Sequence, residues 1–326
     1  MIYFKRTRLM IPFSSFVIVL LAFIYPLTVD ASDNTTQSIT NNDPQVILQQ
    51  TGEEDPYWTE EKMKNAIPAD MDTMLDKKET SETPIPQLEN HQIGENLSHP
   101  FPPEANDLSP YAVVPSTSGK VFFTKSDGKN YVCSGSAINN DYKNLVMTAA
   151  HCVHEGPGGG WHSNIRFAPA YYEGVSHYGL WEWRTVRTFN GWINNRNYDY
   201  DQAFFTVFPR DNRNLINTVG GNGLSYNYGQ AQQNVRISGY PAEAPYDGEL
   251  PYSCYGDTHK RLTNNDAYMN CNMTGGASGG PWFREMISEN LGYVFAVTSR
   301  RSTSGVQRLY ARPNTQAVKD MFDEMR

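Results

Sequence analysis

The sequence lacks the signatures of several common protein classes. No internal repeat is visible along its 326 residues, so an architecture built from repeated units is not indicated. It contains only four cysteines, and these lack the paired close spacing that is typical of structural zinc sites. In an exported chain, four cysteines are most simply two disulfides.

An excess of positive charge is also absent. Residues 1–31 have a balance of +2, and residues 32–110 carry 16 acidic and 4 basic side chains, a balance of −12. Subtracting both from the net charge of −8 leaves +2 for residues 111–326. The acidity therefore belongs to one segment, and the remainder gives no reason to expect nucleic acid as a partner.

The one long apolar stretch lies at the N-terminus. A basic start precedes an apolar core at residues 16–25, and Val29-Asp30-Ala31 places small residues where a signal peptidase cuts. We expect residues 1–31 to be a signal peptide that is cleaved after Ala31, which makes the protein secreted, with no stable membrane association afterwards. The alternative is an uncleaved anchor, since no charge interrupts residues 9–29, but the short core and two prolines favour cleavage.

Residues 32–110 are rich in Asp, Glu, Asn, Thr, Gln and Pro and have few large apolar residues. Such a segment buries too little surface to offset its ordering entropy. We predict an acidic, largely disordered pro-segment, with a short helix around residues 55–65.

Residues 111–326 have a different character. Short β-branched and aromatic runs, separated by Gly, Asn, Asp and Pro clusters, predict an all-β domain. The expected strands lie at residues 120–124, 130–138, 144–147, 181–188, 203–207, 234–239, 293–298 and 307–311. After residue 314 the apolar residues recur at helical spacing, which predicts a C-terminal helix.

Two motifs suggest nucleophilic catalysis. Residues 275–282 read GGASGGPW, so Ser278 is flanked by glycines that permit a tight turn with an exposed hydroxyl and converging backbone N–H groups. His151 follows an apolar run, residues 145–150, that is typical of a buried strand, and histidine has a suitable pKa for a general base. The other six histidines, His154 and His162 among them, stand in polar surroundings where a solvated surface position is the default.

These motifs resemble those of the trypsin/chymotrypsin-like serine endopeptidases. Residues 148–152 read TAAHC and residues 276–281 read GASGGP, which match the histidine and serine motifs of that family. The pattern is most similar to the secreted microbial glutamyl-endopeptidase-like branch. The resemblance implies a double six-stranded β-barrel with a C-terminal helix, peptide or protein substrates, a monomer, and no metal or organic cofactor.

The resemblance also implies roles for individual residues. His151 would be the base, Ser278 the nucleophile, and the N–H groups of Gly276 and Ser278 the oxyanion hole. For the carboxylate, Asp201-Gln202-Ala203-Phe204-Phe205 fits the family pattern better than a reading from Asp199, which remains the alternative.

The family also implies the disulfide pairing. Cys133 would bond to Cys152, which leaves Cys254 and Cys271 for each other. A zinc site made of Cys133, His151, Cys152 and His154 is the competing interpretation of that cysteine pair.

Two departures from the digestive members matter. Ala277 replaces the Asp that serves as their activation switch, and Asn272 replaces the acid that binds Arg or Lys in the substrate pocket. By resemblance, Asn272, Thr298 and Ser299 would line this pocket, and Arg300 and Arg301 are candidate partners for an acidic substrate side chain.

Three expectations about function follow. The main one is a secreted serine endopeptidase whose pro-segment, residues 32–110, holds the enzyme inactive or assists folding. The alternatives are a catalytically silent protease homologue and a surface-anchored binding module, because a fold alone does not establish a function.

Overall fold

The computed structural model describes residues 33–44, 55–69, 73–74, 93–104, 114–302 and 305–325. The predicted signal peptide, residues 1–31, lies outside these ranges. Within them, no helix has both the length and the apolar character needed to cross a bilayer.

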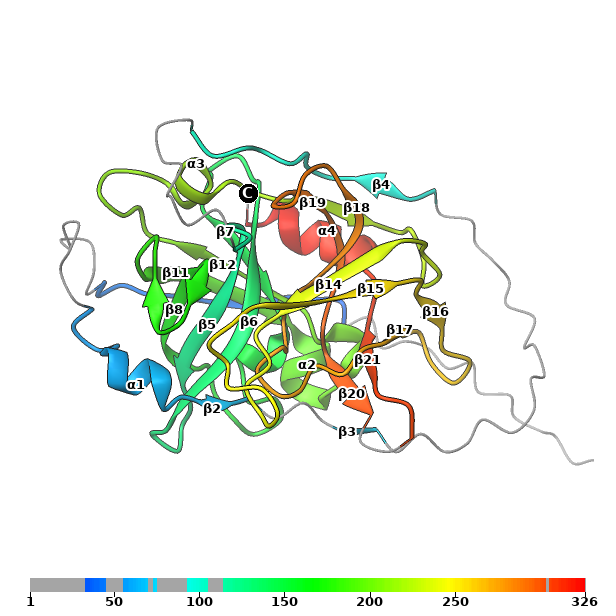
Figure 1. Cartoon of the computed structure of the whole chain (residues 1–326), viewed down its shortest axis with the longest axis horizontal. Coiled ribbons are helices and arrows are strands. Elements are labelled where there is room, and N and C mark those ends of the chain that lie inside the picture. Colours follow the sequence, from blue (N-terminus) through cyan, green and yellow to red (C-terminus); the bar gives the residue numbers. More distant parts are fainter. Residues whose placement is uncertain are drawn as a thin grey trace, which may run out of the picture.

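The first half of the all-β region, from β5 to β12, is a closed antiparallel barrel (Figure 1). The neighbour order is β11-β12-β7-β6-β5-β8, and β8 returns to pair with β11, which completes a ring of six strands. Closure leaves no unpaired edge within the ring. Its strands are β5 (Ser118–Thr124), β6 (Asn130–Ile138), β7 (Leu145–Thr148), β8 (Ser163–Pro169), β11 (Trp181–Phe189) and β12 (Ala203–Val207).

The second half consists of two sheets around one core. The first sheet contains β13 (Gly223–Tyr226), β14 (Val235–Gly239), β15 (Tyr252–Gly256), β18 (Pro281–Met286) and β19 (Gly292–Val297). The second contains β16 (His259–Lys260), β17 (Ala267–Asn270), β20 (Arg300–Ser302) and β21 (Arg308–Ala311). Together the two halves form the predicted all-β, double-barrel fold.

Short elements connect the strands. They are η1 (Ala150–Cys152), β9 (Tyr171–Tyr172), β10 (Val175–Ser176), α2 (Asn190–Asn195), η2 (Tyr198–Tyr200) and α3 (Leu215–Val219).

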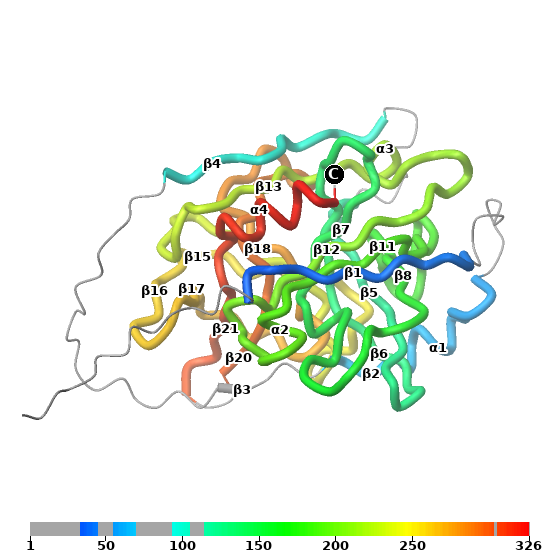
Figure 2. Tube along the Cα trace, turned by 180° about the vertical axis from the view of Figure 1, so that it is seen from behind, coloured from blue at the N-terminus to red at the C-terminus, as the bar shows by residue number. Residues whose placement is uncertain are grey.

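The predicted C-terminal helix is present as α4 (Gln316–Asp323). Its apolar face buries Val318, Met321 and Phe322 in a cluster that also contains Phe204 of the first half and Val294 of the second. The helix therefore packs where the two halves meet, and Figure 2 shows it in red beside β13 and above β1.

The described parts of residues 32–110, the predicted pro-segment, have more structure than we expected. They form β1 (Thr36–Thr40), α1 (Glu60–Lys64), β2 (Ile67–Pro68), β3 (Thr73–Met74) and β4 (Glu95–Asn96). β1 pairs with β11, β2 with β6, β3 with β20 and β4 with β13. The expected short helix is confirmed by α1, and the expectation of disorder is wrong for these stretches. They have no core of their own, and contacts with residues 114–325 offset their ordering entropy.

Candidate active site

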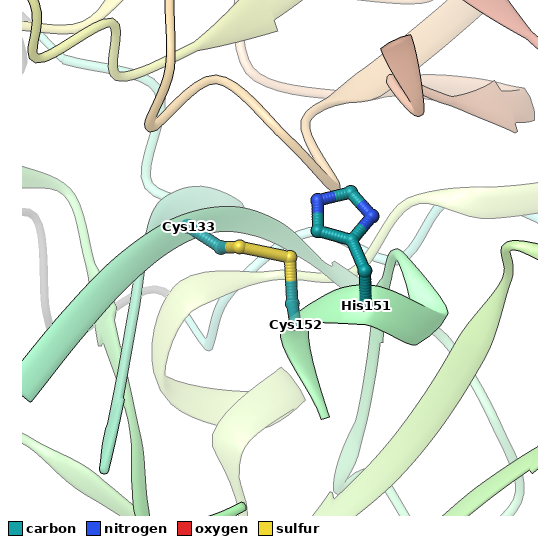
Figure 3. A group of neighbouring side chains, drawn as sticks. All are labelled: Cys133, His151 and Cys152. Carbon is teal, nitrogen blue, oxygen red and sulfur yellow. A yellow bond between two sulfur atoms is a disulfide. The ribbon is translucent and has the colours of Figure 1, made fainter. Parts of the chain in front are cut away.

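His151 lies in the turn that follows β7 and is held there by a disulfide. The adjacent Cys152 bonds to Cys133 of β6 with an S–S distance of 2.04 Å, and the imidazole stands beside this bridge (Figure 3). The bridge consumes both thiolates that the zinc interpretation required, and His154 Nδ1 accepts the backbone N–H of Gly156 instead. The second expected disulfide, Cys254–Cys271, is also present.

Asp201 orients His151 from the end of η2. Its carboxylate accepts the backbone N–H of His151 at 2.9 Å, and its Oδ2 lies 2.8 Å from His151 Nδ1. Asp201 is 1% exposed, as expected for the buried carboxylate of such a pair. Asp199, the alternative, instead accepts the side-chain amide of Asn265 at 2.7 Å.

The surroundings of Asp201 keep it ionised. Burial alone would raise the pKa of its carboxyl group, but the charge of His151 and the hydrogen bonds from His151 and Ser299 together hold the pKa below its ordinary value. Ser299 Oγ donates to Asp201 Oδ2 at 2.6 Å. The sequence placed Ser299 in the substrate pocket and missed this contact.

Ser278 lies on a turn that only glycine permits. Gly276 and Gly279 have φ of 93° and 79°, in the left-handed region. A Cβ on Gly279 would come within 2.1 Å of the Thr148 hydroxyl, and one on Gly280 within 2.1 Å of the Ser238 carbonyl oxygen. The glycines of the motif therefore allow this loop to pack directly on β7 and β14.

The loop brings Ser278 to the turn that carries His151. The carbonyl oxygen of Ser278 accepts the N–H of Ser134 at 2.7 Å and lies 3.8 Å from Cys152 Sγ. Ser278 Oγ and His151 Nε2 are both buried, and neither has a hydrogen-bond partner among the described residues. Within the same described part of the chain, no acceptor faces the backbone N–H of Gly276 or Ser278.

The three residues assigned to the substrate pocket have different surroundings. Asn272 is exposed, whereas Thr298 is fully buried and accepts the indole N–H of Trp282 at 2.9 Å. The hydroxyl of Ser299 is bonded to Asp201.

Both arginines that were candidates for an acidic substrate already have carboxylate partners. Arg300 is 5% exposed and pairs with the buried Asp266, and its guanidinium lies 4.2 Å from the ring centre of Tyr198. Arg301 pairs with Glu243 at 2.5 Å on the loop that precedes β15. Arg300 is thus committed to a structural pair, and Arg301 is the more accessible of the two.

A cavity of about 480 Å³ opens beside His151. Polar and aromatic side chains line it, so it suits an amphipathic substrate side chain. The lining includes His151, Glu155, Trp192, Arg196, Tyr198 and Ser299.

His154 and His162 are buried, which corrects the surface positions that we expected. They are 4% and 3% exposed. His162 stacks on Phe123 with ring centres 4.5 Å apart, and its Nε2 lies 3.2 Å from the carbonyl oxygen of His151. Burial lowers the pKa of His162 to about 3, so the ring is neutral and supports the His151 turn.

This fold is similar to those of solved proteases. No protein-family model matches the chain, and no curated protein matches it. A thermostable serine protease from an extremophilic microorganism, AL20, superposes with a TM-score of 0.61 and 29% identity, covering 65% of this chain and 97% of that one. A Glu endopeptidase has a TM-score of 0.53 and 20% identity, covering 70% of this chain and 96% of that one, which shows the fold alone.

The protease Anisep from Arthrobacter nicotinovorans is also similar. It superposes with a TM-score of 0.60 and 34% identity, and the match covers 65% of this chain and 95% of Anisep. The part of this chain that Anisep does not match is long enough to include the N-terminal segments that precede the barrels. The chain thus belongs to the trypsin/chymotrypsin-like serine endopeptidases.

Proposed function

We propose that the protein is a secreted serine endopeptidase that hydrolyses peptide bonds through His151, Asp201 and Ser278. One observation supports this most strongly. Asp201 binds Nδ1 and the backbone N–H of His151. Nε2 of the same ring and the Ser278 hydroxyl are buried and have no hydrogen-bond partner among the described residues. His151 is thereby oriented as a base, and its Nε2 is available to accept the proton of the Ser278 hydroxyl.

In the first half of the reaction, Ser278 Oγ attacks the carbonyl carbon of the scissile bond while its proton moves to His151 Nε2. The buried Asp201 carboxylate stabilises the imidazolium that forms. When the tetrahedral intermediate collapses, the C–N bond breaks and His151 gives the proton to the departing amine. The acyl group remains on Ser278 as an ester.

In the second half, a water molecule attacks the ester and transfers a proton to His151. The C–O bond to Ser278 then breaks, Oγ recovers the proton, and the carboxylic acid leaves. The backbone N–H groups of Gly276 and Ser278 would stabilise the oxyanion of both intermediates, since no described residue accepts their hydrogen bonds. None of these steps uses a metal or an organic cofactor.

Export and maturation are part of the proposal. The N-terminal signal and two disulfides suit an oxidising compartment outside the cell. The domain that follows the pro-segment would begin near Tyr111 and act on peptides as a monomer, with the pro-segment restraining activity until it is removed.

A silent homologue and a surface-anchored binding module share this fold. The oriented His151 and the glycine-supported Ser278 turn argue against both, because binding alone requires neither.

Hydrolysis of a quenched fluorescent peptide library tests the proposal. We expect the mature wild-type protein to cleave peptides and the Ser278→Ala variant, secreted at the same level, to be inactive. A preference for Glu or Asp before the cut would implicate Arg301 in specificity. Equal activity of the two proteins would refute the assignment of Ser278.

A further inference from the structure

We propose that the protease domain carries a docking site for its own residues 55–69, the anchor segment, separate from the catalytic residues. Asp55 and Trp58 are its anchors, and the docked segment occupies backbone hydrogen-bonding groups beside the Ser278 loop. The inhibitory part of this proposal rests on the proposed function, whereas the docking part does not.

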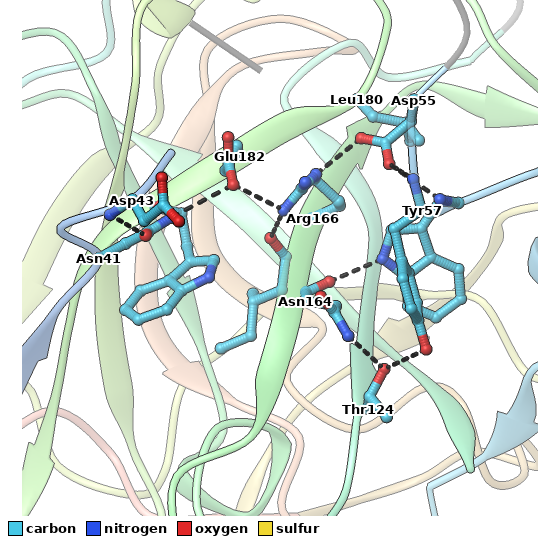
Figure 4. A network of polar contacts seen from close by, with 12 residues as sticks. Asn41, Asp43, Asp55, Tyr57, Thr124, Asn164, Arg166, Leu180 and Glu182 are labelled. Atoms are coloured by element: carbon cyan, nitrogen blue, oxygen red, sulfur yellow. Dashed lines mark hydrogen bonds and ion pairs between the residues drawn. The ribbon is translucent and has the colours of Figure 1, made fainter. Parts of the chain in front are cut away.

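The first anchor is a buried ion pair. Asp55 Oδ2 lies 2.7 Å from Arg166 Nε of β8, and both side chains are 1% exposed (Figure 4). Glu182 approaches the same guanidinium at 3.3 Å. The other carboxylate oxygen of Asp55 accepts the backbone N–H groups of Tyr57 and Trp58. The domain therefore presents a buried cation whose Nε, among the described residues, is satisfied by the anchor segment alone.

The second anchor is Trp58, which is 2% exposed. Its indole N–H donates to the carbonyl oxygen of Asn164 at 2.7 Å, and its ring lies 5.2 Å from that of Phe122. The buried cluster around it also contains Leu180, Tyr171 and Tyr240 of the domain and Met63 of α1. A Trp in an apolar pocket beside a paired Arg is the composition of a binding hot spot.

The anchored segment ends at the catalytic loop. After α1, Ile67 and Pro68 pair in parallel with Tyr131 and Val132 of β6. The N–H of Ala69 then donates to the carbonyl oxygen of Val132 at 2.9 Å.

Ala69 is 1% exposed, and its carbonyl oxygen lies 3.3 Å from where a Cβ on Gly275 would stand. Gly275 is three residues before Ser278, which is fully buried. The segment thus ends against the loop that carries the nucleophile.

A second backbone pairing begins at residue 73. The backbone of Thr73 and Met74 pairs in parallel with Arg301 and Ser302 of β20. Three residues lie between positions 69 and 73, and the four extended Cα–Cα steps that connect them span at most about 14 Å. The segment is therefore bonded to β6, whose Ser134 contacts Ser278, and to β20, which follows Ser299, and a substrate cannot use those backbone groups at the same time.

The ring of six strands is closed without β2. The anchor segment is therefore an addition to the strand ring and is not one of the barrel strands. The segment should consequently remain bound after the chain is cut on either side of it, and act as a non-covalent inhibitor until it dissociates.

The full chain with Ser278→Ala tests docking, because this variant cannot cut itself. Recognition sequences for a specific protease are inserted within residues 46–52 and 79–90, so that after cutting neither β1 nor β4 retains the fragment. We expect the excised fragment to co-elute with the domain in size-exclusion chromatography. A fragment that elutes alone would overturn the proposal.

The anchors are tested by exchange. A labelled synthetic peptide of residues 52–76 displaces the excised fragment, and Asp55→Asn and Trp58→Ala peptides should each bind at least tenfold more weakly. The Glu61→Gln peptide is the matched control, because Glu61 is exposed and the same charge is lost. Equal binding of all four peptides would overturn the anchor assignment.

Inhibition has its own readout. The wild-type peptide should slow labelling of the active protein by a fluorophosphonate, and the Trp58→Ala peptide should do so only at tenfold higher concentration. Unchanged labelling with peptide bound would overturn the inhibitory role. A protein that retains the fragment but never hydrolyses peptides would fail the proposed function alone.

Discussion

Ser299 Oγ donates a hydrogen bond of 2.6 Å to Asp201 Oδ2, the same oxygen that lies 2.8 Å from His151 Nδ1. One carboxylate oxygen is therefore shared by the histidine that it orients and by a serine from the other half of the molecule. The link places the geometry of His151 under the control of both barrels.

Replacing Asp201 by Asn should lower kcat roughly 10⁴-fold, because the amide no longer favours the required imidazole tautomer or stabilises the imidazolium. Asp199→Asn is the matched control and should change kcat by less than about threefold, since Asp199 contacts Asn265 and not His151. Steady-state hydrolysis of a peptide substrate measures both. A larger loss in Asp199→Asn would exchange the two assignments.

Ser299→Ala should lower kcat about tenfold and leave KM within about twofold. The variant removes a charge-assisted hydrogen bond, of which roughly 1.4 kcal/mol would appear in the transition state. Ser302→Ala, three residues further along the chain, breaks a bond to the carbonyl oxygen of Val306 and should leave kcat unchanged. If both serines affect kcat equally, the contact with Asp201 has no special role.

His162 should make the protein sensitive to acid. Burial lowers the pKa of His162 to about 3. Below about pH 6.5 the imidazole is therefore protonated in the unfolded chain but stays neutral in the folded protein. The free energy of unfolding should therefore fall as the pH is lowered from 6.5 towards 3, by at most about 1.4 kcal/mol per pH unit from this group.

Urea unfolding between pH 4 and 7, in the Ser278→Ala background, measures this slope. His162→Gln should flatten it, and His259→Gln, at an exposed position, should not. A slope that is unchanged in His162→Gln would contradict the explanation.

The two disulfides should differ in their effect on activity. Each closes a loop of similar length, with sequence separations of 19 and 17, so its loss should cost about 3 kcal/mol of stability. Changing Cys133 and Cys152 to Ser should also reduce kcat, because that bridge holds the His151 turn. Changing Cys254 and Cys271 should leave kcat intact at a temperature where the protein remains folded.

Strands with continuous apolar or aromatic runs were predictable. β5, β6, β7 and β12 agree with their expected ranges to within two residues, because a continuous apolar run of this length is typical of a strand that is buried on both faces. β8 was missed, since it contains Asn164 in a left-handed conformation and the buried Arg166. A buried charge appears polar in a sequence, and its partner Asp55 is 111 residues away.

The site was predictable to the extent that it depends on local motifs. The His151 turn and the Ser278 loop each have a residue pattern that their backbone geometry requires. The role of Ser299 depends instead on its hydrogen bond to Asp201, a contact across 98 residues that no local pattern encodes. For the same reason residues 32–110 were predicted to be largely disordered, since most of the apolar partners of Trp58 belong to the folded domain.

The central claim is that Ser278 is a nucleophile activated by His151, and its most direct test is labelling of the mature protein with a fluorophosphonate, followed by mass spectrometry of the peptides. We predict that the peptide containing Ser278 gains the phosphonyl mass in the wild type and that Ser278→Ala remains unlabelled. No labelling of the mature wild-type protein, or equal labelling of the two proteins, would contradict the account.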